Sequence, residues 1–308
     1  MSQDSQSHNT LPFNFEINFT YREAVEVAPD VHRIVARNPG PFTFKGTNSY
    51  LIGSKKLALI DPGPELEEQL ESIIQALDGR ELTHIVLTHS HRDHADGVEN
   101  LKQVTGAKIC SFRPTHRIMA HVPGWQAEES SYHGNIVPEV ELEDGDVVEG
   151  NGWALQAIHT PGHAPDHICL EMRNTGLVFS GDHVMSWNTS SISPPEGSMS
   201  AYIRSLETLL ARDDDLYFPG HGGRIQRPRR VVKAYLLHRG MREKAILDTV
   251  ETGMESVATI TDAIYPDLDE SLRRAAEQSV KAHLIRLVEL NKIMTEGSVT
   301  MTSVFRKS

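Results

Sequence analysis

The segment Thr88–His94 limits most strongly what this 308-residue chain can fold into. Its sequence, Thr-His-Ser-His-Arg-Asp-His, places three imidazoles and one carboxylate within six positions, directly after the apolar run Ile85–Leu87. The apolar run predicts a buried strand, and the acidic start and apolar spacing of Asp96–Val104 predict a short helix. Functional side chains in α/β proteins are typically found at the carboxyl end of such a strand.

Imidazole and carboxylate groups at this spacing indicate a metal site. Both donors suit Zn²⁺, with Mn²⁺ or Fe²⁺ as alternatives. His89 and His91, two residues apart, can face one ion, whereas Asp93 and His94, across the turn, can face a second. The competing interpretation is a solvated, histidine-rich loop without a metal.

Three further candidate sites follow apolar strands in the same way, and each places a ligand type beside Gly or Pro. Small residues at these points let the backbone turn sharply and approach an ion closely. The candidates are His163 within His159–His163, Asp182 within Ser180–Asp182, and His221 within Pro219–Gly223. Each motif alone is weak, but the ordered series after the Thr88–His94 segment is specific.

The remaining patterns outline the secondary structure. Apolar runs predict strands at Val31–Ala36, Thr47–Gly53, Leu57–Ile60 and Ala107–Phe112, and a hairpin that joins Val147–Glu149 to Trp153–Ile158. Helical spacing predicts helices at Glu65–Leu77, Arg227–Val250, Val257–Tyr265 and Leu272–Leu290, with a small hairpin in 291–308. We therefore expect a flexible segment over 1–20, a catalytic domain over 21–225 and a helical domain over 226–308.

Charge is distributed unevenly between these parts. The net charge of −12 divides into −15 for residues 1–225 and +3 for residues 226–308. An acidic body repels polyanions, so only the tail can attract a nucleic acid. No secretory signal and no apolar run of membrane-spanning length is visible, and the two cysteines do not form a disulfide framework. We expect a cytoplasmic protein without a membrane partner.

The ordered set of Asp61, the His89–His94 loop, His163, Asp182 and His221 resembles the metallo-β-lactamase superfamily, over roughly residues 30–225. The resemblance implies an α/β fold, a four-layer αββα sandwich with the site along one edge of its two sheets. It also implies two divalent metal ions, with zinc favoured. The reaction class it implies is hydrolysis by a hydroxide that bridges the metals.

The resemblance also assigns a role to each position. The first metal would take His89, His91 and His163; the second would take Asp93, His94 and His221; Asp182 would bridge both, and Asp61 would orient a ligand. We assign Asp93, Asp182 and His163 as the catalytic residues within this set. His159, His167 and His183 are further candidates, either to orient ligands or to protonate a leaving group. The alternative for each is a histidine at a strand end that bonds to the backbone.

Two stretches narrow the resemblance. Asn38–Tyr50, with its Gly-Thr-Asn-Ser-Tyr end, and Met185–Pro195 are similar to the lactamase-beta-2-like branch, which carries a carboxyl-terminal winged helix. That branch implies endoribonuclease activity on single-stranded RNA. The +3 tail favours RNA binding, whereas the −15 body opposes it, because phosphate contacts dominate nucleic-acid affinity.

Three other functions remain open. A small-molecule thioester or ester hydrolase similar to glyoxalase II would use the same ligand set. A β-lactam hydrolase is a weaker match, because those enzymes lack an aspartate equivalent to Asp182. A non-catalytic binding module conflicts with the unbroken ligand set. Since winged helices also serve as dimerisation modules, a homodimer is a further expectation.

Overall fold

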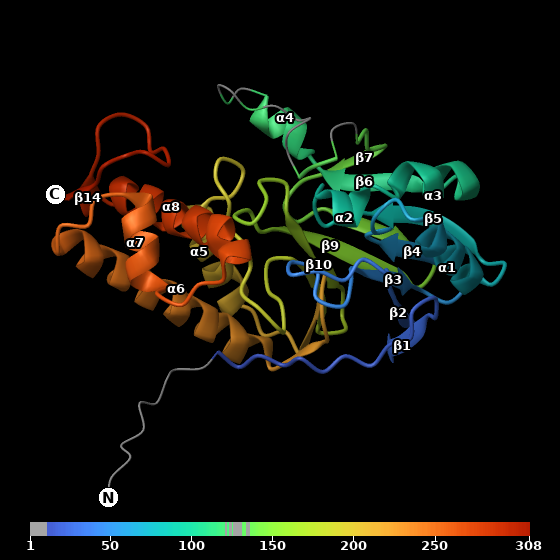
Figure 1. Cartoon of the computed structure of the whole chain (residues 1–308). Helices are drawn as coiled ribbons and strands as arrows, with labels where there is room; N and C mark the ends of the chain where they lie inside the picture. The colour runs from blue at the N-terminus through green and yellow to red at the C-terminus, as the bar shows by residue number, and fades with distance from the viewer. Residues whose placement is uncertain (1–10, 121, 123–124, 126–130, 134–135) are drawn as a thin grey trace, which may run out of the picture.

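Two β-sheets stacked face to face form the centre of the computed structural model, which describes residues 11–120, 122, 125, 131–133 and 136–308. Helices cover the outer face of each sheet, and a group of carboxyl-terminal helices lies beside the sandwich (Figure 1). This arrangement confirms the predicted fold class, an αββα sandwich followed by a small helical domain.

The first sheet has seven strands, which follow one another in chain order. They are β1 (Val25–Ala28), β2 (Val31–Val35), β3 (Asn48–Ile52), β4 (Lys56–Ile60), β5 (Glu81–Val86), β6 (Lys108–Phe112) and β7 (Val140–Leu142). Pairing is antiparallel from β1 to β4 and parallel from β4 to β7. The buried side chains of Leu57–Ile60 reflect a strand that is covered on both faces.

The second sheet has six strands in the order β13-β12-β11-β10-β9-β8. They are β8 (Val147–Gly150), β9 (Trp153–His159), β10 (Ile168–Met172), β11 (Leu177–Gly181), β12 (Leu216–Pro219) and β13 (Ile225–Gln226). β8 and β9 form the predicted hairpin, and β11 and β12 are parallel.

Apolar side chains fill three layers of this sandwich. Tyr50, Phe179 and Phe218 are among the buried residues between the sheets. Outside the first sheet, α1 (Glu67–Leu77) and α3 (Val98–Thr105) bury residues such as Ile73 and Leu101. Outside the second sheet, α5 (Met199–Leu210) packs against the amino-terminal half of α6 (Pro228–Glu251).

The parallel pairs bring the predicted ligands to one edge of the sandwich. β4 and β5 run in the same direction, so Asp61 and the His89–His94 loop emerge side by side. β11 and β12 do the same for Asp182 and His221. α2 (Arg92–Ala95) follows the loop, while α4 (Thr115–Met119) lies farther along the chain.

The carboxyl-terminal helices have a core of their own. Ile246 and Val250 of α6 pack with α7 (Val257–Ile264), α8 (Arg273–Glu289) and the hairpin of β14 (Ile293–Met294) and β15 (Arg306–Lys307). Because Val231 and Tyr235 of the same helix lie in the core beside the second sheet, α6 belongs to both parts. None of the helices that the structure describes combines the length and apolarity needed to cross a membrane.

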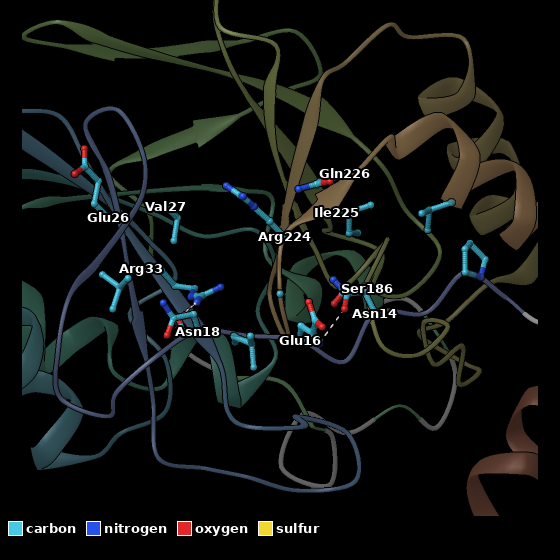
Figure 2. A pocket seen from close by; sticks show the side chains of 15 residues that line it. Asn14, Glu16, Asn18, Glu26, Val27, Arg33, Ser186, Arg224, Ile225 and Gln226 are labelled. Atoms are coloured by element: carbon cyan, nitrogen blue, oxygen red, sulfur yellow. Dashed lines mark hydrogen bonds between the residues drawn. The ribbon is translucent and has the colours of Figure 1, made fainter.

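Residues 11–20 run as an extended strap against the sandwich, so this half of the expected flexible segment is packed; residues 1–10 lie outside the described residues. The amide of Asn14 donates to the Ser186 carbonyl at 2.7 Å, and Arg33 donates to the Asn18 carbonyl at 2.6 Å. A cavity of about 580 Å³ lies beneath the strap, with Arg33 and Arg224 among its lining (Figure 2). These bonds hold the strap against β2 and against the segment that follows β11.

Candidate metal centre

Asp61 and Thr88 form the base of the site where β4 and β5 end. The Thr88 amide donates to Asp61 Oδ1 at 2.8 Å, and its hydroxyl donates to Oδ2 at 2.7 Å. Both side chains are buried, so these two bonds hold the start of the histidine loop in one position.

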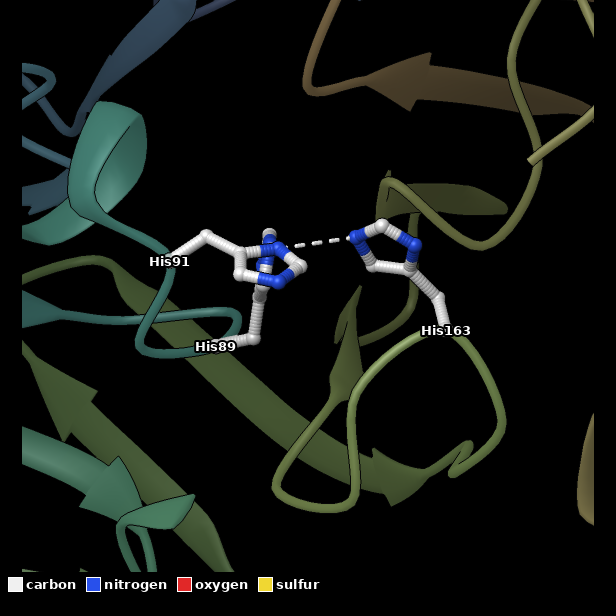
Figure 3. Close-up of side chains that lie close together, drawn as sticks. All are labelled: His89, His91 and His163. Carbon is white, nitrogen blue, oxygen red and sulfur yellow. Dashed lines mark hydrogen bonds between the residues drawn. The ribbon is translucent and has the colours of Figure 1, made fainter. Parts of the chain in front are cut away.

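Three imidazoles converge above this base. His91 Nδ1 lies 2.8 Å from His89 Nε2 and 2.9 Å from His163 Nε2. Figure 3 shows His163 reaching from the β9–β10 loop toward the two histidines that follow β5. The three nitrogens lie within 4.8 Å of one another and can bind one metal ion.

A second group lies next to the first. His221 Nε2 is 3.2 Å from His94 Nε2 and 3.2 Å from Asp93 Oδ2, and these three atoms form another candidate ligand set. Asp182 faces both groups: its Oδ2 is 3.6 Å from His163 Nε2 and 3.4 Å from His221 Nε2. The structure thus brings all seven proposed ligands together, with Asp182 between the two sets.

The other nitrogen of several rings is held by a neighbour. His163 Nδ1 lies 2.7 Å from the Ser191 carbonyl, and His221 Nδ1 lies 3.2 Å from the Gly46 carbonyl. His94 Nδ1 lies 2.9 Å from Asp61 Oδ2. Donation from Nδ1 leaves the Nε2 lone pair directed at the centre, as metal-binding histidines require.

Burial keeps two of the imidazoles neutral. Burial, together with His94, holds the pKa of His89 well below its ordinary value. Burial and then His163 lower the pKa of His91 to about 3. Both rings are therefore unprotonated at pH 7 and can donate a lone pair.

For the carboxylates, nearby charges outweigh the effect of burial on the pKa. Burial raises the pKa of Asp93 and Asp182, but the nearby His94 and His221 outweigh it and leave both pKa values lowered. Burial likewise opposes protonation of His221, yet Asp182 and Asp93 raise its pKa to about 9. The centre is thus built around ionised carboxylates that need positive charge nearby.

This donor set fits two divalent cations. Among the described residues, the buried Oδ1 atom of Asp182 accepts no hydrogen bond and lies 3.5 Å from His94 Nε2, a position in which a bound cation would stabilise the carboxylate. Neutral imidazole and ionised carboxylate are the ligands that Zn²⁺, Mn²⁺ and Fe²⁺ accept.

Comparison with known proteins agrees with this geometry. The family profile described as the metallo-beta-lactamase superfamily matches residues 42–221. The chain belongs to the metallo-beta-lactamase superfamily. A second profile, the beta-lactamase associated winged helix domain, matches residues 256–302. The predicted family and its winged-helix extension are confirmed.

Relatives that span most of this chain are known. A beta-lactamase-like protein 2 homolog from Caenorhabditis elegans is 30% identical over 276 residues, 88% of each chain. An atrochrysone carboxyl ACP thioesterase from Cryptosporiopsis sp. is 28% identical, covering 89% of this chain and 84% of the relative. The crystal structure of a beta-lactamase domain protein from Burkholderia ambifaria, 20% identical, matches with a TM-score of 0.81 over 97% of both chains, which shows the shared fold.

The three additional histidines lie in different surroundings. His167 accepts from the Asp182 amide at 3.2 Å, and its other ring nitrogen lies 2.9 Å from Thr160 Oγ1, so it holds the backbone of a ligand. His183 is fully buried, and neither ring nitrogen has a hydrogen-bond partner. His159 instead stacks on Phe112 with ring centres 4.0 Å apart, and it bonds to the Pro165 carbonyl. Of the alternatives for His159, these contacts agree with a strand-end histidine that bonds to the backbone.

The Gly46–Tyr50 signature has a structural role that the sequence alone did not indicate. The Asn48 side chain donates to the Pro219 and Gly222 carbonyls, both at 2.9 Å, and Tyr50 donates to Pro219 at 2.7 Å. These bonds tie β3 to the loop that carries His221. The signature therefore positions His221, one of the proposed metal ligands.

A cavity of about 800 Å³ opens onto the centre. Its walls include Tyr132, Trp187 and residues of the 188–196 loop. The carboxyl-terminal helices also contribute, with Arg239 of α6 and Arg274 of α8. The place of Arg274 at this cavity could not be read from the sequence, because nothing in an amphipathic helix indicates which face borders a distant site.

Proposed function

We propose that this protein is a dinuclear metal-dependent hydrolase that cleaves a thioester or ester of a small acyl substrate. The observation that carries the proposal is the cavity: apolar and aromatic groups such as Met185, Trp187 and Leu268 line it beside the seven ligands. A relative named as an ACP thioesterase supports the same choice.

Bound divalent cations would activate a water molecule and polarise the substrate carbonyl oxygen. His89, His91 and His163 would hold one ion, Asp93, His94 and His221 the other, with Asp182 shared. Burial raises the pKa of Tyr132 well above its ordinary value, so this phenol beside the cavity stays protonated. A thiolate leaves without protonation more readily than an alkoxide, because a thiol, with a pKa of about 8.5, is a stronger acid than an alcohol.

Cleavage of single-stranded RNA is the second candidate. Trp187 and the exposed Phe42 line the cavity and offer surfaces on which bases can stack. The net charge of −15 in residues 1–225 opposes this function, since RNA affinity depends on phosphate neutralisation.

A substrate panel separates these functions. Purified protein is assayed against an acetyl thioester of N-acetylcysteamine, a single-stranded RNA and a chromogenic cephalosporin. We expect thioester cleavage; turnover of RNA alone would refute the thioesterase proposal.

Substituting the shared ligand tests the centre itself. We expect about two metal ions per chain in the wild type, and Asp182→Asn should lose metal and activity together because it removes a negative charge from both sets. Asp213→Asn is the matched control, since the Asp213 side chain is 97% exposed. Full activity in Asp182→Asn would contradict the ligand assignment.

A further inference from the structure

One wall of the cavity contains a buried positive charge without a counter-ion. Arg239 on α6 is only 3% exposed, and its Nε atom has no hydrogen-bond partner. Its guanidinium donates to the Ser190 carbonyl and lies 5.2 Å from the centre of the Tyr202 ring. Among the described residues, no carboxylate forms an ion pair with it. Burying a charge in this way is costly unless an anion compensates it.

Other polar groups on the same wall also lack partners. His238 precedes Arg239 on α6, and its Nδ1 atom is buried and unbonded. Gln278 of α8 also lines the cavity; its amide nitrogen can donate to an anion, whereas its buried Oε1 atom is an acceptor and bonds to no described residue. Arg274, one turn before Gln278, is exposed and lines the same cavity. Two cations, Arg239 and Arg274, thus line one cavity from two helices.

The same cavity also reaches the candidate metal centre. Asp93 and Asp182 line it, together with imidazoles that would hold the metal ions. A substrate bound in this cavity with its carbonyl at the metal centre would place a negatively charged group beside Arg239 or Arg274.

We propose that Arg239, with Gln278 and Arg274, forms a subsite for an anionic group of the substrate, a carboxylate or a phosphate monoester. This inference rests on the proposed hydrolase function and narrows its substrate class to acidic thioesters or esters. A planar guanidinium binds either oxyanion through paired, charge-assisted hydrogen bonds. In a thioester substrate, the anionic group can be a carboxylate on the acyl part or a phosphate on the thiol part.

The subsite is tied rigidly to the metal centre. Arg239 donates to the Ser190 carbonyl, and the Ser190 hydroxyl donates to the Asp182 carbonyl at 2.6 Å. The next residue, Ser191, accepts from His163. Substituting Arg239 therefore disturbs the metal centre as well, and the test must measure selectivity instead of activity alone.

Two matched substrate pairs provide that measurement. The acyl pair is the succinyl and butyryl thioesters of N-acetylcysteamine; the thiol pair is the acetyl thioesters of 4′-phosphopantetheine and pantetheine. For the metal-loaded wild type, we expect kcat/KM to favour the anionic member of at least one pair by about tenfold or more. The favoured pair identifies carboxylate or phosphate as the ligand.

Arg239→Met should reduce this ratio to near one, mainly through a higher KM for the anionic substrate, whereas a purely structural role would slow both members equally. If Arg239→Met does not fold, Arg239→Lys and Arg274→Met replace it, and each should lower the ratio by several-fold. Lys244→Met, an exposed change on the same helix, is the control and should leave the ratio unchanged. Equal kcat/KM within both wild-type pairs, or a ratio that survives these substitutions, would overturn the subsite. Cleavage of no thioester at all would instead overturn the proposed function.

Discussion

Position 220 leaves no room for a side chain beside the metal centre. A Cβ atom on Gly220 would lie 2.5 Å from Asp182 Oδ1 and 2.6 Å from the His94 ring. We therefore expect Gly220→Ala to displace a ligand and to reduce bound metal well below that of the wild type, measured by metal analysis after gel filtration. Gly240→Ala is the matched control, because no atom lies within 4 Å of a Cβ there. Unchanged metal content in Gly220→Ala would contradict the ligand geometry.

His283 on α8 gives the protein a predictable response to acid. It is fully buried with both ring nitrogens unbonded, and burial, reinforced by Arg239, holds its pKa well below the ordinary value. The unfolded chain therefore binds a proton below pH ~6.5 that the folded chain does not, so stability is present above that pH and falls below it.

His283→Leu removes this proton-binding difference. We expect the variant to be more stable than the wild type, with an advantage that grows between pH 7.5 and pH 5 by up to about 1.4 kcal/mol per pH unit. Urea unfolding of metal-depleted protein at several pH values measures it. Parallel stability profiles for the two proteins would show that His283 does not titrate in this way.

At the scale of elements, the strap of residues 11–20 supports the loop that carries His221. The Glu16 carbonyl would lie 2.2 Å from a Cβ on Gly223, so strap and loop are in close contact. Deleting residues 1–20 should lower the melting temperature and speed the loss of metal to a chelator. Gly223→Ala, which forces the strap away, should do the same to a smaller extent. Metal retention equal to that of the wild type in both would contradict this role.

Much of this element pattern could be predicted from the sequence, because each proposed ligand follows an apolar strand. The metal loop, the β8–β9 hairpin, the two long carboxyl-terminal helices and the short helix between them follow directly from local periodicity. β1 was missed because its four residues, of which none is fully buried, are too few to give a clear pattern. α5 was missed although Met199, Tyr202, Leu206 and Leu209 have helical spacing after the capping residue Ser198. Arg274 could not be predicted as a cavity residue, because its position depends on how two distant elements dock.

At the scale of the whole molecule, metal binding should couple to global stability. The seven proposed ligands come from loops of both sheets, so each bound ion links the two halves of the sandwich. At a metal concentration 100 times the dissociation constant, one site contributes about 2.7 kcal/mol. We expect chelation to lower the melting temperature of the wild type by several degrees, measured by calorimetry. Asp182→Asn should respond far less, and equal melting temperatures with and without chelator would argue against a structural contribution of the metals.

α6 has a further consequence for how this protein can be rebuilt. One continuous helix supplies Val231 and Tyr235 to the sandwich and Ile246 and Val250 to the winged helix, with Arg239 between them. The catalytic domain and the winged-helix domain are therefore joined by one continuous helix, with no loop between them. This helix sets how far apart the two domains lie on either side of the cavity. A chimera that takes its carboxyl-terminal domain from a relative should therefore be joined beyond Val250. A junction at residue 225 would replace α6 and remove Arg239 from the wall of the cavity.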